Sequence, residues 1–232
     1  MSSVLSALGL LLLVSFLLGS VPWGLVISRL VYHKDLRSEG SGNIGTTNAM
    51  RSLGKVGGAS VFVLDFGKGL LSGYLGSVAA GWILGQVLAS NLGSVLGLPQ
   101  SDLLFLVPGW CMATAFAGCV FGHIFSPWLK FHGGKGVAVA VGSLFFVFGI
   151  PGAVIELLLF AVLVFTSKYV SVGSLGAAVL CPFLGFYFYW GNWAACVVIT
   201  LVALVVIWAH RQNIARLAQG NENRIGSKKK EA

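Results

Sequence analysis

Long apolar runs recur along almost the whole chain, and they constrain its fold more than any other feature. Only 9% of the 232 residues are charged, whereas 56% are hydrophobic. A soluble domain carries roughly a quarter charged residues, so this chain has too few charges to cover a surface that faces water. Because a spanning helix needs about 20 apolar residues, the pattern predicts an all-α integral membrane protein, with residues 1–232 forming one bundle.

The apolar runs predict about seven transmembrane helices. Val137–Ser167 fits either one long helix or two short helices broken at Pro151-Gly152. Lys135 and Lys168 flank this stretch, and two crossings would keep both lysines on one side, so we expect a hairpin of two short helices. The other expected spans are Val4–Val31, Val56–Trp82, Leu103–Phe125, Tyr169–Trp190 and Trp193–Ala209, and Gly85–Asp102 is expected to be a loop with a short interfacial helix.

The distribution of basic residues predicts the orientation in the membrane. With seven crossings and the N-terminus outside, nearly every Lys and Arg falls in or beside the same set of cytoplasmic segments. These are Tyr32–Lys55, Ser126–Gly136, the turn at Lys168 and the tail from His210, so the C-terminus is predicted to be cytoplasmic. Most of the formal net charge of +8 is then explained by the basic cytoplasmic loops that set the topology. The remaining basic residues could bind an anionic substrate. We expect no nucleic-acid partner.

A glycine-rich segment is the first candidate site. It runs Gly40-Ser41-Gly42-Asn43-Ile44-Gly45-Thr46-Thr47-Asn48 and is followed by Arg51. Glycines let backbone N–H groups approach an anion, and Arg51 can bind a phosphate with two parallel hydrogen bonds. The alternative is a flexible polar loop. The candidates here are Ser41 and Arg51 as catalytic residues, and Gly42, Asn43, Thr46 and Asn48 for substrate binding.

A second candidate is the Gly-Gly-Lys-Gly turn. In Lys130-Phe131-His132-Gly133-Gly134-Lys135-Gly136 it leads into an apolar helix, so free N–H groups, a positive helix end and an ammonium would lie together. The spacing is not that of a Walker motif. The alternative is a basic loop that only sets topology. Gly133, Gly134, Lys135 and Gly136 are the candidates here.

Further polar residues lie at helix ends or inside spans. His210 and Asn213 are three residues apart and share a helical face, so both could form hydrogen bonds to a substrate. The alternative is that they belong to a solvated helix end. Asp65 and Lys68 can form an i,i+3 ion pair inside the second span or act functionally, and the role of Glu156 is open. Ser171 and Ser174 open the sixth span, where serine hydroxyls usually bond to preceding carbonyls.

Taken together, these motifs resemble the PlsY family, the acyl-phosphate–glycerol-3-phosphate acyltransferases of the bacterial inner membrane. The resemblance covers nearly the whole chain, and the combination of its motifs is highly specific. Besides the segments above, it includes Gly19-Ser20-Val21-Pro22-Trp23-Gly24, Asp35-Leu36-Arg37, His123, Arg216-Leu217, Gly220 and Glu222. The chain departs from the family by Ser126 where Pro is usual and by Thr46 where Ala is common. The family's serine-rich motif is Ser171-Val172-Gly173-Ser174 here, so either serine is a candidate substrate contact.

The resemblance implies an activity. Acyl phosphate, not acyl-CoA, would donate its acyl group to the 1-hydroxyl of glycerol 3-phosphate, giving lysophosphatidic acid and phosphate in the first acylation of phospholipid biosynthesis. The family's site lacks a dedicated catalytic base, the substrate phosphate assisting instead. No metal or cofactor is implied, and functional coupling to the soluble enzyme that forms acyl phosphate is a possible partnership. Membrane lipid would surround the chain, and the site would face the cytoplasm.

The residues by themselves agree with part of this reading. No His is followed five residues later by Asp, the acid–base pair of the unrelated acyl-CoA-dependent enzymes, and Asp65 and His210 are the obvious bases. Acyl phosphate is already activated, so positioning and charge stabilisation can suffice. We expect Ser41, Arg51, Lys135 and Ser174 to hold phosphates, and His210 and Asn213 to orient glycerol 3-phosphate and the reacting carbonyl. The main alternative is a transporter of an anionic phosphorylated metabolite; a structural protein would leave the polar motifs unexplained.

Overall fold

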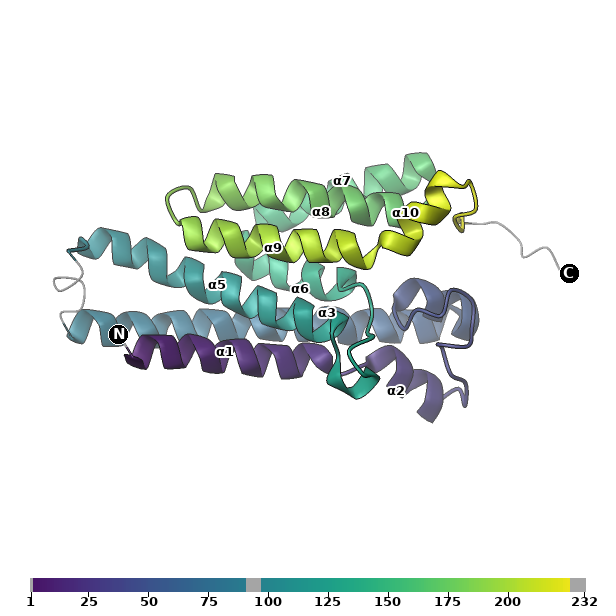
Figure 1. Ribbon diagram of the computed structural model, residues 1–232, viewed down its shortest axis with the longest axis horizontal. Coiled ribbons are helices and arrows are strands. Elements are labelled where there is room, and N and C mark those ends of the chain that lie inside the picture. The colour runs from purple at the N-terminus through teal and green to yellow at the C-terminus, as the bar shows by residue number, and fades with distance from the viewer. Residues whose placement is uncertain (1, 91–96, 226–232) are drawn as a thin grey trace, which may run out of the picture.

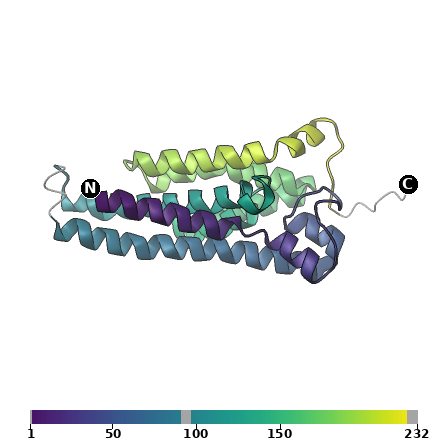
Figure 2. The ribbon, with the colours of Figure 1, turned by 60° about the horizontal axis from the view of Figure 1, so that its bottom comes forward.

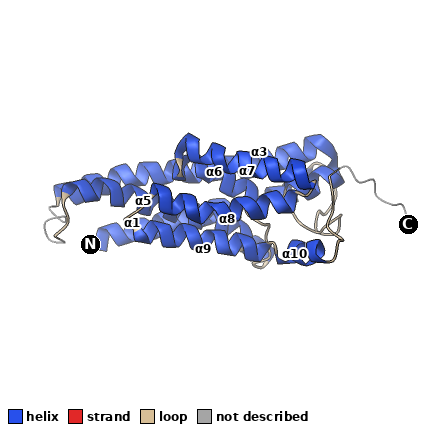
Figure 3. Cartoon of the chain, turned by 90° about the horizontal axis from the view of Figure 1, so that it is seen from above, coloured by secondary structure: helices blue, strands red, loops and turns tan. Residues whose placement is uncertain are grey.

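The computed structural model describes residues 2–90 and 97–225. The described residues form helices joined by turns and loops, with no strand among them (Figures 1 and 3). In chain order the elements are α1 (Ser2–Ser20), α2 (Trp23–Leu30), α3 (Thr46–Ala89), α5 (Gln100–Ile124), the 3-10 helix η1 (Pro127–Leu129), α6 (Val137–Val147), α7 (Gly149–Ser167), α8 (Val170–Phe188), α9 (Trp193–Ala209) and α10 (Arg211–Ala218).

The long helices run side by side in one elongated bundle. α1 packs along α5, and both pack against α3; on the other side α8 packs between α7 and α9. The short α6 lies between the two groups and contacts α3, α5 and α7. The N-terminus and α10 lie at opposite ends of the bundle (Figures 1 and 2). Large apolar side chains remain exposed along these helices, as expected for a surface covered by lipid.

The all-α membrane fold is confirmed, but the described residues contain fewer full-length spans than the seven predicted. Five segments in the described residues are long and apolar enough to cross a membrane, and the bent pair α9 and α10 makes a sixth. α6 has only 11 residues, about 16 Å of helix, which is roughly half the hydrocarbon thickness. The predicted total of about seven is therefore reached only by counting this half-length helix.

The ambiguous stretch Val137–Ser167 forms two helices, as predicted, but the predicted break at Pro151-Gly152 is wrong. The chain breaks between Val147 and Gly149, where Gly149 has a positive φ of 66°. Pro151 instead lies in the first turn of α7, where a missing backbone N–H costs no helical hydrogen bond.

The first predicted span, Val4–Val31, corresponds to one candidate membrane span, Ser3–Leu30, but this span is not one continuous helix. It divides into α1 and α2 at Val21-Pro22, because proline cannot donate a helical hydrogen bond and restricts the residue before it. At the break, the carbonyl oxygen of Val21 accepts two hydrogen bonds, from the Trp23 N–H at 3.1 Å and from Lys68 Nζ at 2.9 Å. The interruption thus connects the first membrane segment to the buried polar residues of α3.

The second predicted span, Val56–Trp82, lies within a longer helix. α3 begins at Thr46, inside the stretch predicted as a polar loop, and continues to Ala89, with a kink at Gly54 where φ is 81°. The start of the predicted loop Gly85–Asp102 is therefore helical. The short interfacial helix expected there concerns a segment whose residues 91–96 lie outside the described residues.

Glycines bring α3 and α6 into backbone contact. A Cβ on Gly69 would collide with the carbonyl oxygen of Val139, and a Cβ on Gly142 would collide with the carbonyl oxygen of Phe66. Helices in lipid associate through close packing, and residues without a side chain permit the closest approach. This contact sets the position of α6, and therefore of the turn that precedes it.

Candidate active site

The polar motifs meet in a cavity of about 290 Å³ at the end of the bundle far from the N-terminus. The loops that precede α3 and α6, together with α8 and α10, contribute to it. Most of the residues predicted from sequence line this cavity: Ser41, Asn43, Thr46, Asn48, Arg51, Lys135, Gly136, Ser171, Ser174, His210 and Asn213. Segments as far apart in sequence as Ser41 and Asn213 thus form one site.

Three predicted glycines do not line the cavity and instead shape the loops around it. Gly42 has a positive φ of 71° and donates a backbone hydrogen bond to the carbonyl of Glu39. A Cβ on Gly133 would collide with the His123 carbonyl, and one on Gly134 would collide with the His123 ring. The tight turn before Lys135 therefore requires glycine for packing.

Asn48 holds the glycine-rich loop together. Its side-chain nitrogen donates to the carbonyl oxygens of Leu36, Glu39 and Asn43 at 2.8–3.1 Å, and its side-chain oxygen accepts from the Ser41 N–H at 2.9 Å. The side chain is 2% exposed, and its two N–H hydrogens are shared among the three carbonyls, so its hydrogen-bonding groups are used within the protein. Its contacts support a role in positioning the loop.

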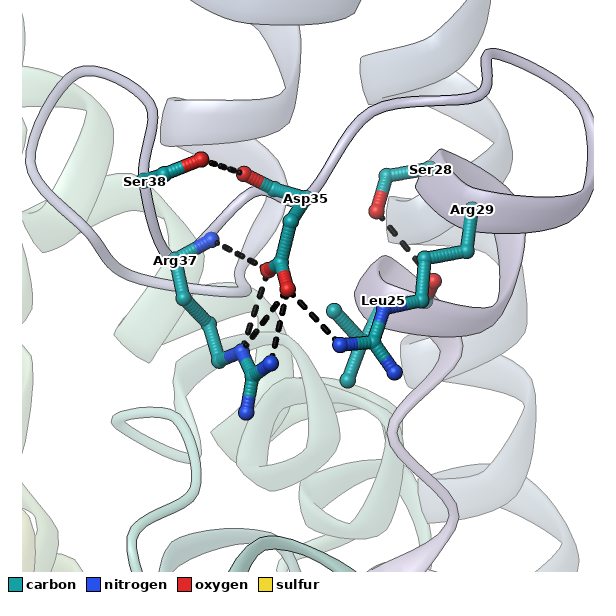
Figure 4. Close-up of polar contacts among 6 residues, drawn as sticks. All are labelled: Leu25, Ser28, Arg29, Asp35, Arg37 and Ser38. Carbon is teal, nitrogen blue, oxygen red and sulfur yellow. Dashed lines mark hydrogen bonds and ion pairs between the residues drawn. The ribbon is translucent and has the colours of Figure 1, made fainter.

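An ionic cluster braces the start of the same loop (Figure 4). Asp35 forms ion pairs of 2.7 Å with Arg29 of α2 and with Arg37, and its backbone carbonyl accepts from the Ser38 hydroxyl. Hydrogen bonds from Arg37 and Arg29 hold the pKa of the Asp35 carboxyl well below its usual range, although partial burial opposes them. The charged carboxylate fixes the loop relative to α2.

The N-terminal ends of three helices reach the cavity. Its lining includes Thr46 at the start of α3, Val137 at the start of α6, and Val170 at the start of α8. First-turn N–H groups lack helical partners and each helix end carries a partial positive charge, so such ends bind anions. The Thr46 hydroxyl is buried and has no hydrogen-bond partner among the described residues, which leaves it available to a ligand.

Two cations face the same space without a carboxylate within ion-pair distance in the described part of the chain. These are Arg51 and Lys135. Arg51 makes a long hydrogen bond of 3.5 Å to the Asn223 carbonyl. Burial and repulsion from Arg216 lower the pKa of Lys135 to about 8, although Glu222 partly offsets them. Burial is the largest cause, but the repulsion from Arg216 and Arg51 shows that cations gather here, which suits a phosphate dianion.

His210 and Asn213 lie where α9 bends into α10 at an angle of 52°. The nitrogen His210 Nδ1 is 2.7 Å from the Val206 carbonyl oxygen, which can only accept, so Nδ1 carries the proton and Nε2 is the free acceptor of the neutral ring. Asn213 donates its amide to Glu222 at 2.7 Å, and its side-chain oxygen is buried without a partner in the described residues. Two unused acceptors thus occur three residues apart.

Glu222 is the residue whose role sequence reasoning missed. It accepts hydrogen bonds from Asn213, from Arg216 at 2.7 Å and from the Ser171 hydroxyl at 3.1 Å. Burial alone would raise the pKa of its carboxyl, but these hydrogen bonds lower it overall. The segment then continues to Asn223, which also lines the cavity. The family motif quoted from the sequence contains Glu222, but nothing local in the sequence indicates that it connects α8 to α10.

Of the two alternatives for Asp65 and Lys68, the structure shows the ion pair, with Lys68 Nζ 2.9 Å from Asp65 Oδ1. Lys68 also donates to the Val21 carbonyl and contacts His123 Nδ1, each at 2.9 Å. An ammonium only donates, so His123 Nδ1 accepts and its proton lies on Nε2, the atom next to Gly134. This buried triad connects α3 and α5 to the break between α1 and α2 and to the turn that carries Lys135.

The two candidate serines differ in their contacts. The Ser171 hydroxyl donates to Glu222, whereas the Ser174 hydroxyl donates to the Val170 carbonyl one turn earlier in α8. Both line the cavity. Ser174 also borders a second, apolar cavity of about 50 Å³ deeper in the bundle, with which the first shares Val137, Val141, Leu157, Phe160 and Ser174. The site therefore has a polar mouth and an apolar branch.

Comparison with known proteins places this arrangement in a family. Residues 9–220 match the sequence profile described as Glycerol-3-phosphate acyltransferase. A glycerol-3-phosphate acyltransferase of Bradyrhizobium diazoefficiens is 38% identical over 217 residues, covering 94% of each chain. The enzyme of the same name from Thermosynechococcus vestitus is 36% identical over 221 residues, covering 95% of this chain and 96% of the relative.

Two crystal structures share the fold. One is PlsY (YgiH), an integral membrane glycerol 3-phosphate acyltransferase, in its glycerol 3-phosphate form, with a TM-score of 0.72 and 34% identity over 95% of this chain and 96% of that one. The lysophosphatidic acid form gives a TM-score of 0.68 and 32% identity over the same shares. The family match favours the enzyme over the transporter considered above. This chain belongs to the glycerol-3-phosphate acyltransferase family and is a multi-pass integral membrane acyltransferase.

Proposed function

We propose that this enzyme transfers an acyl group from acyl phosphate to the 1-hydroxyl of glycerol 3-phosphate, giving lysophosphatidic acid and inorganic phosphate. The observation that carries the proposal is the cavity itself. Phosphate groups would bind at the N-terminal ends of three helices and at two cations that have no carboxylate partner in the described residues. An acyl chain would bind in the apolar branch. Both substrates carry a phosphate, and one carries a long hydrocarbon chain.

The phosphate groups would bind among the loop ends. Arg51, Lys135 and the Thr46 hydroxyl line the same cavity and would bind the anions together. Ser41 and the backbone of the loop that includes Asn43 would add further hydrogen bonds. Gly136 would contribute backbone at the start of α6, and Ser171 or Ser174 would donate from α8. Asn48, Gly42, Gly133 and Gly134 would act by shaping the loops.

Glycerol 3-phosphate has two hydroxyls, and two acceptors of the site have no hydrogen-bond partner among residues 2–90 and 97–225. His210 Nε2 and Asn213 Oδ1 would each accept one hydroxyl hydrogen bond and so fix the 1-hydroxyl beside the acyl carbonyl. Holding the nucleophile in position lowers the activation barrier, because the entropy of bringing the reactants together is already lost on binding.

In the reaction, the 1-hydroxyl oxygen forms a bond to the acyl carbonyl carbon, and the bond from that carbon to the phosphate oxygen breaks. The hydroxyl proton passes to the departing phosphate, so the products are an ester and inorganic phosphate. Lys135 and Arg51 would stabilise the charge that develops on the leaving phosphate. The site would need no separate base for this transfer.

The acyl chain would enter the apolar branch between α6, α7 and α8, reaching lipid sideways. The enzyme would lie in the bacterial inner membrane with the cavity facing the cytoplasm, where glycerol 3-phosphate is dissolved. Acyl phosphate is a reactive anhydride, so functional coupling to the soluble enzyme that forms it would shorten its exposure to water.

The deciding experiment compares acyl donors on the purified protein. With glycerol 3-phosphate present, acyl phosphate should release inorganic phosphate and yield lysophosphatidic acid, whereas acyl-CoA should yield none. Equal turnover with acyl-CoA, or no phosphate release from acyl phosphate, would overturn the proposal.

Arg51→Ala tests the anion site within the same assay. Loss of a charge-stabilising donor typically costs about 10²–10³-fold in rate, so activity should fall by that order while the protein still folds. Lys55→Ala is the matched control: Lys55 lies four residues further along α3, is exposed and does not line the cavity. Full activity in Arg51→Ala would reject its role.

A further inference from the structure

Glu156 is a buried carboxylic acid that the proposed reaction does not use. It lies in the middle of α7, is 2% exposed, and lines the apolar cavity beyond the catalytic one. Neither of its carboxyl oxygens has a hydrogen-bond partner in the part of the chain that the structure describes. A buried carboxyl without partners costs free energy, so ionisable residues inside membrane segments are rare and usually serve a function.

The surroundings of Glu156 offer it little within the protein. The cavity is lined mostly by Val, Leu, Ala and Phe, and its other polar side chains are Ser174 and the Cys181 thiol. Ser174 already donates its hydroxyl to the Val170 carbonyl. Glu156 thus borders space that an acyl chain can fill, and its hydrogen-bonding capacity is not used by the residues that the structure describes.

This space continues from the catalytic cavity, with which it shares five lining residues. Ser174 borders both cavities, whereas Cys181, seven residues further along α8, borders only the deeper one; seven residues of helix span about 10 Å. α7 and α8 run antiparallel, with Gly173 against Phe160 and Gly152 against Phe188. Glu156 thus lies nearer the Cys181 end than the Ser174 end. A chain whose carbonyl lies near Ser174 would therefore pass Glu156 in its middle part, well beyond the carbons next to the carbonyl.

We propose that Glu156 is a specificity-determining residue that accepts a hydrogen bond from a hydroxyl in the middle of the acyl chain, so that this enzyme favours hydroxylated acyl donors. The inference rests on the proposed acyl transfer and adds the class of acyl group. An unsubstituted chain leaves the carboxyl unpaired beside methylene groups, whereas a hydroxyl at the matching carbon satisfies it. Sites built to hydrogen-bond a hydroxyl discriminate strongly against an analogue that lacks it.

The test measures kcat/KM for acyl phosphates of one chain length, unsubstituted or with a single hydroxyl at successive carbons. Phosphate release by the full-length purified protein is the readout. One position, or two adjacent positions, should be preferred over the unsubstituted chain by about tenfold or more. A flat profile in the wild-type protein would overturn the proposal even if every variant misfolded.

Two substitutions connect the preference to the carboxyl. Glu156→Leu should reduce the ratio of hydroxylated to unsubstituted kcat/KM to about one or below, whereas Glu156→Gln should keep part of it, because an amide oxygen also accepts. Leu158→Ala is the control: Leu158 is 59% exposed on the same helix, and its loss should leave the ratio unchanged. An unaltered ratio in Glu156→Leu would refute the assignment.

A binding measurement separates this inference from the proposed reaction. Lysophosphatidic acids with and without the hydroxyl serve as probes, and binding is read as a rise in the melting temperature of the detergent-solubilised protein. Selective stabilisation by the hydroxylated probe, lost in Glu156→Leu, would support the pocket even if acyl phosphate gave no turnover. Equal stabilisation by both probes would count against the pocket, whatever the acyl donor proves to be.

Discussion

At the scale of single residues, Lys135 determines how activity should depend on pH. Its pKa is lowered to about 8, so its ammonium is charged below that pH and is lost as the pH rises through it. The phosphate of glycerol 3-phosphate, whose second pKa is near 6, is already a dianion in this range. We therefore expect kcat/KM to fall above about pH 8, approaching tenfold per pH unit, because kcat/KM reports the ionisation of the free enzyme.

Lys135→Arg is the companion variant, since a guanidinium stays charged throughout this range. Whatever activity it retains should not fall near pH 8. The kcat profile of the wild type should fall at a higher pH than kcat/KM, because bound phosphate stabilises the ammonium. An identical fall near pH 8 in Lys135→Arg would assign the titration to another group.

The residue types of the site could be predicted from the sequence, but several of their roles could not. Glycine-rich motifs next to Arg51 and Lys135 indicate an anion site, and both residues line one cavity. That the amide of Asn48 is occupied by its own loop depends on the folded path of residues 36–43. The pairing of Glu222 depends likewise on how the chain returns after α10.

At the scale of elements, the contact between α3 and α6 should limit stability. Gly69→Ala would place a methyl group against the Val139 carbonyl and push the two backbones apart. The melting temperature in detergent should fall by several degrees, since overpacking typically costs about 1–3 kcal/mol.

Gly67→Ala is the control two residues away on the same helix. A Cβ at Gly67 meets nothing within 4 Å, and alanine is the better helix former, so the melting temperature should stay or rise. Equal melting temperatures for the two variants would show that the close approach of α3 and α6 contributes nothing to stability.

The link that Glu222 makes between α8 and α10 gives a second prediction at this scale. Glu222→Gln removes the negative charge that raises the pKa of Lys135, and it weakens the bond to Arg216. We expect kcat/KM to decrease about tenfold, or ~1.4 kcal/mol, and its fall with pH to move below 8. Asp102→Asn, at the far end of α5, should change neither property; an unshifted profile in Glu222→Gln would contradict the link.

Helix positions were predictable from the apolar runs, but their ends and breaks were not. A hydropathy pattern does not indicate that Val21-Pro22 interrupts the first segment or that α3 begins at Thr46. Both features depend on backbone hydrogen bonds rather than on the polarity of side chains. The hairpin α6–α7 was predicted from flanking charges, whereas the place of its break follows from the conformation of Gly149.

At the scale of the whole molecule, the gathering of polar loops at one end of the bundle agrees with the prediction made from charge. Charge asymmetry is a global property, and so it could predict which loops share a side before any helix was placed. It could not predict a half-length α6, whose start lies beside the cavity and whose 11 residues reach only about half the membrane.

The orientation of the bundle is tested by introducing single cysteines and labelling them with a membrane-impermeant thiol reagent. The four native cysteines are all buried, so background labelling should be low. Lys34→Cys and Lys130→Cys, both exposed and in the two loops around the cavity, should react only from the cytoplasmic side. Ser101→Cys, exposed at the start of α5, should react only from outside, because the 25 residues of α5 span about 37 Å.

Each labelled variant should retain acyltransferase activity, which shows that the reactive cysteine belongs to folded protein. Reaction of Lys34→Cys and Lys130→Cys from the same side as Ser101→Cys would reject the predicted spans. Reaction of the two loop cysteines from opposite sides would be more serious: Arg51 and Lys135 could not then contact the same phosphates, and the shared active site would be impossible. Reaction of both only from outside would keep the site but reverse the membrane orientation, leaving it without access to cytoplasmic glycerol 3-phosphate.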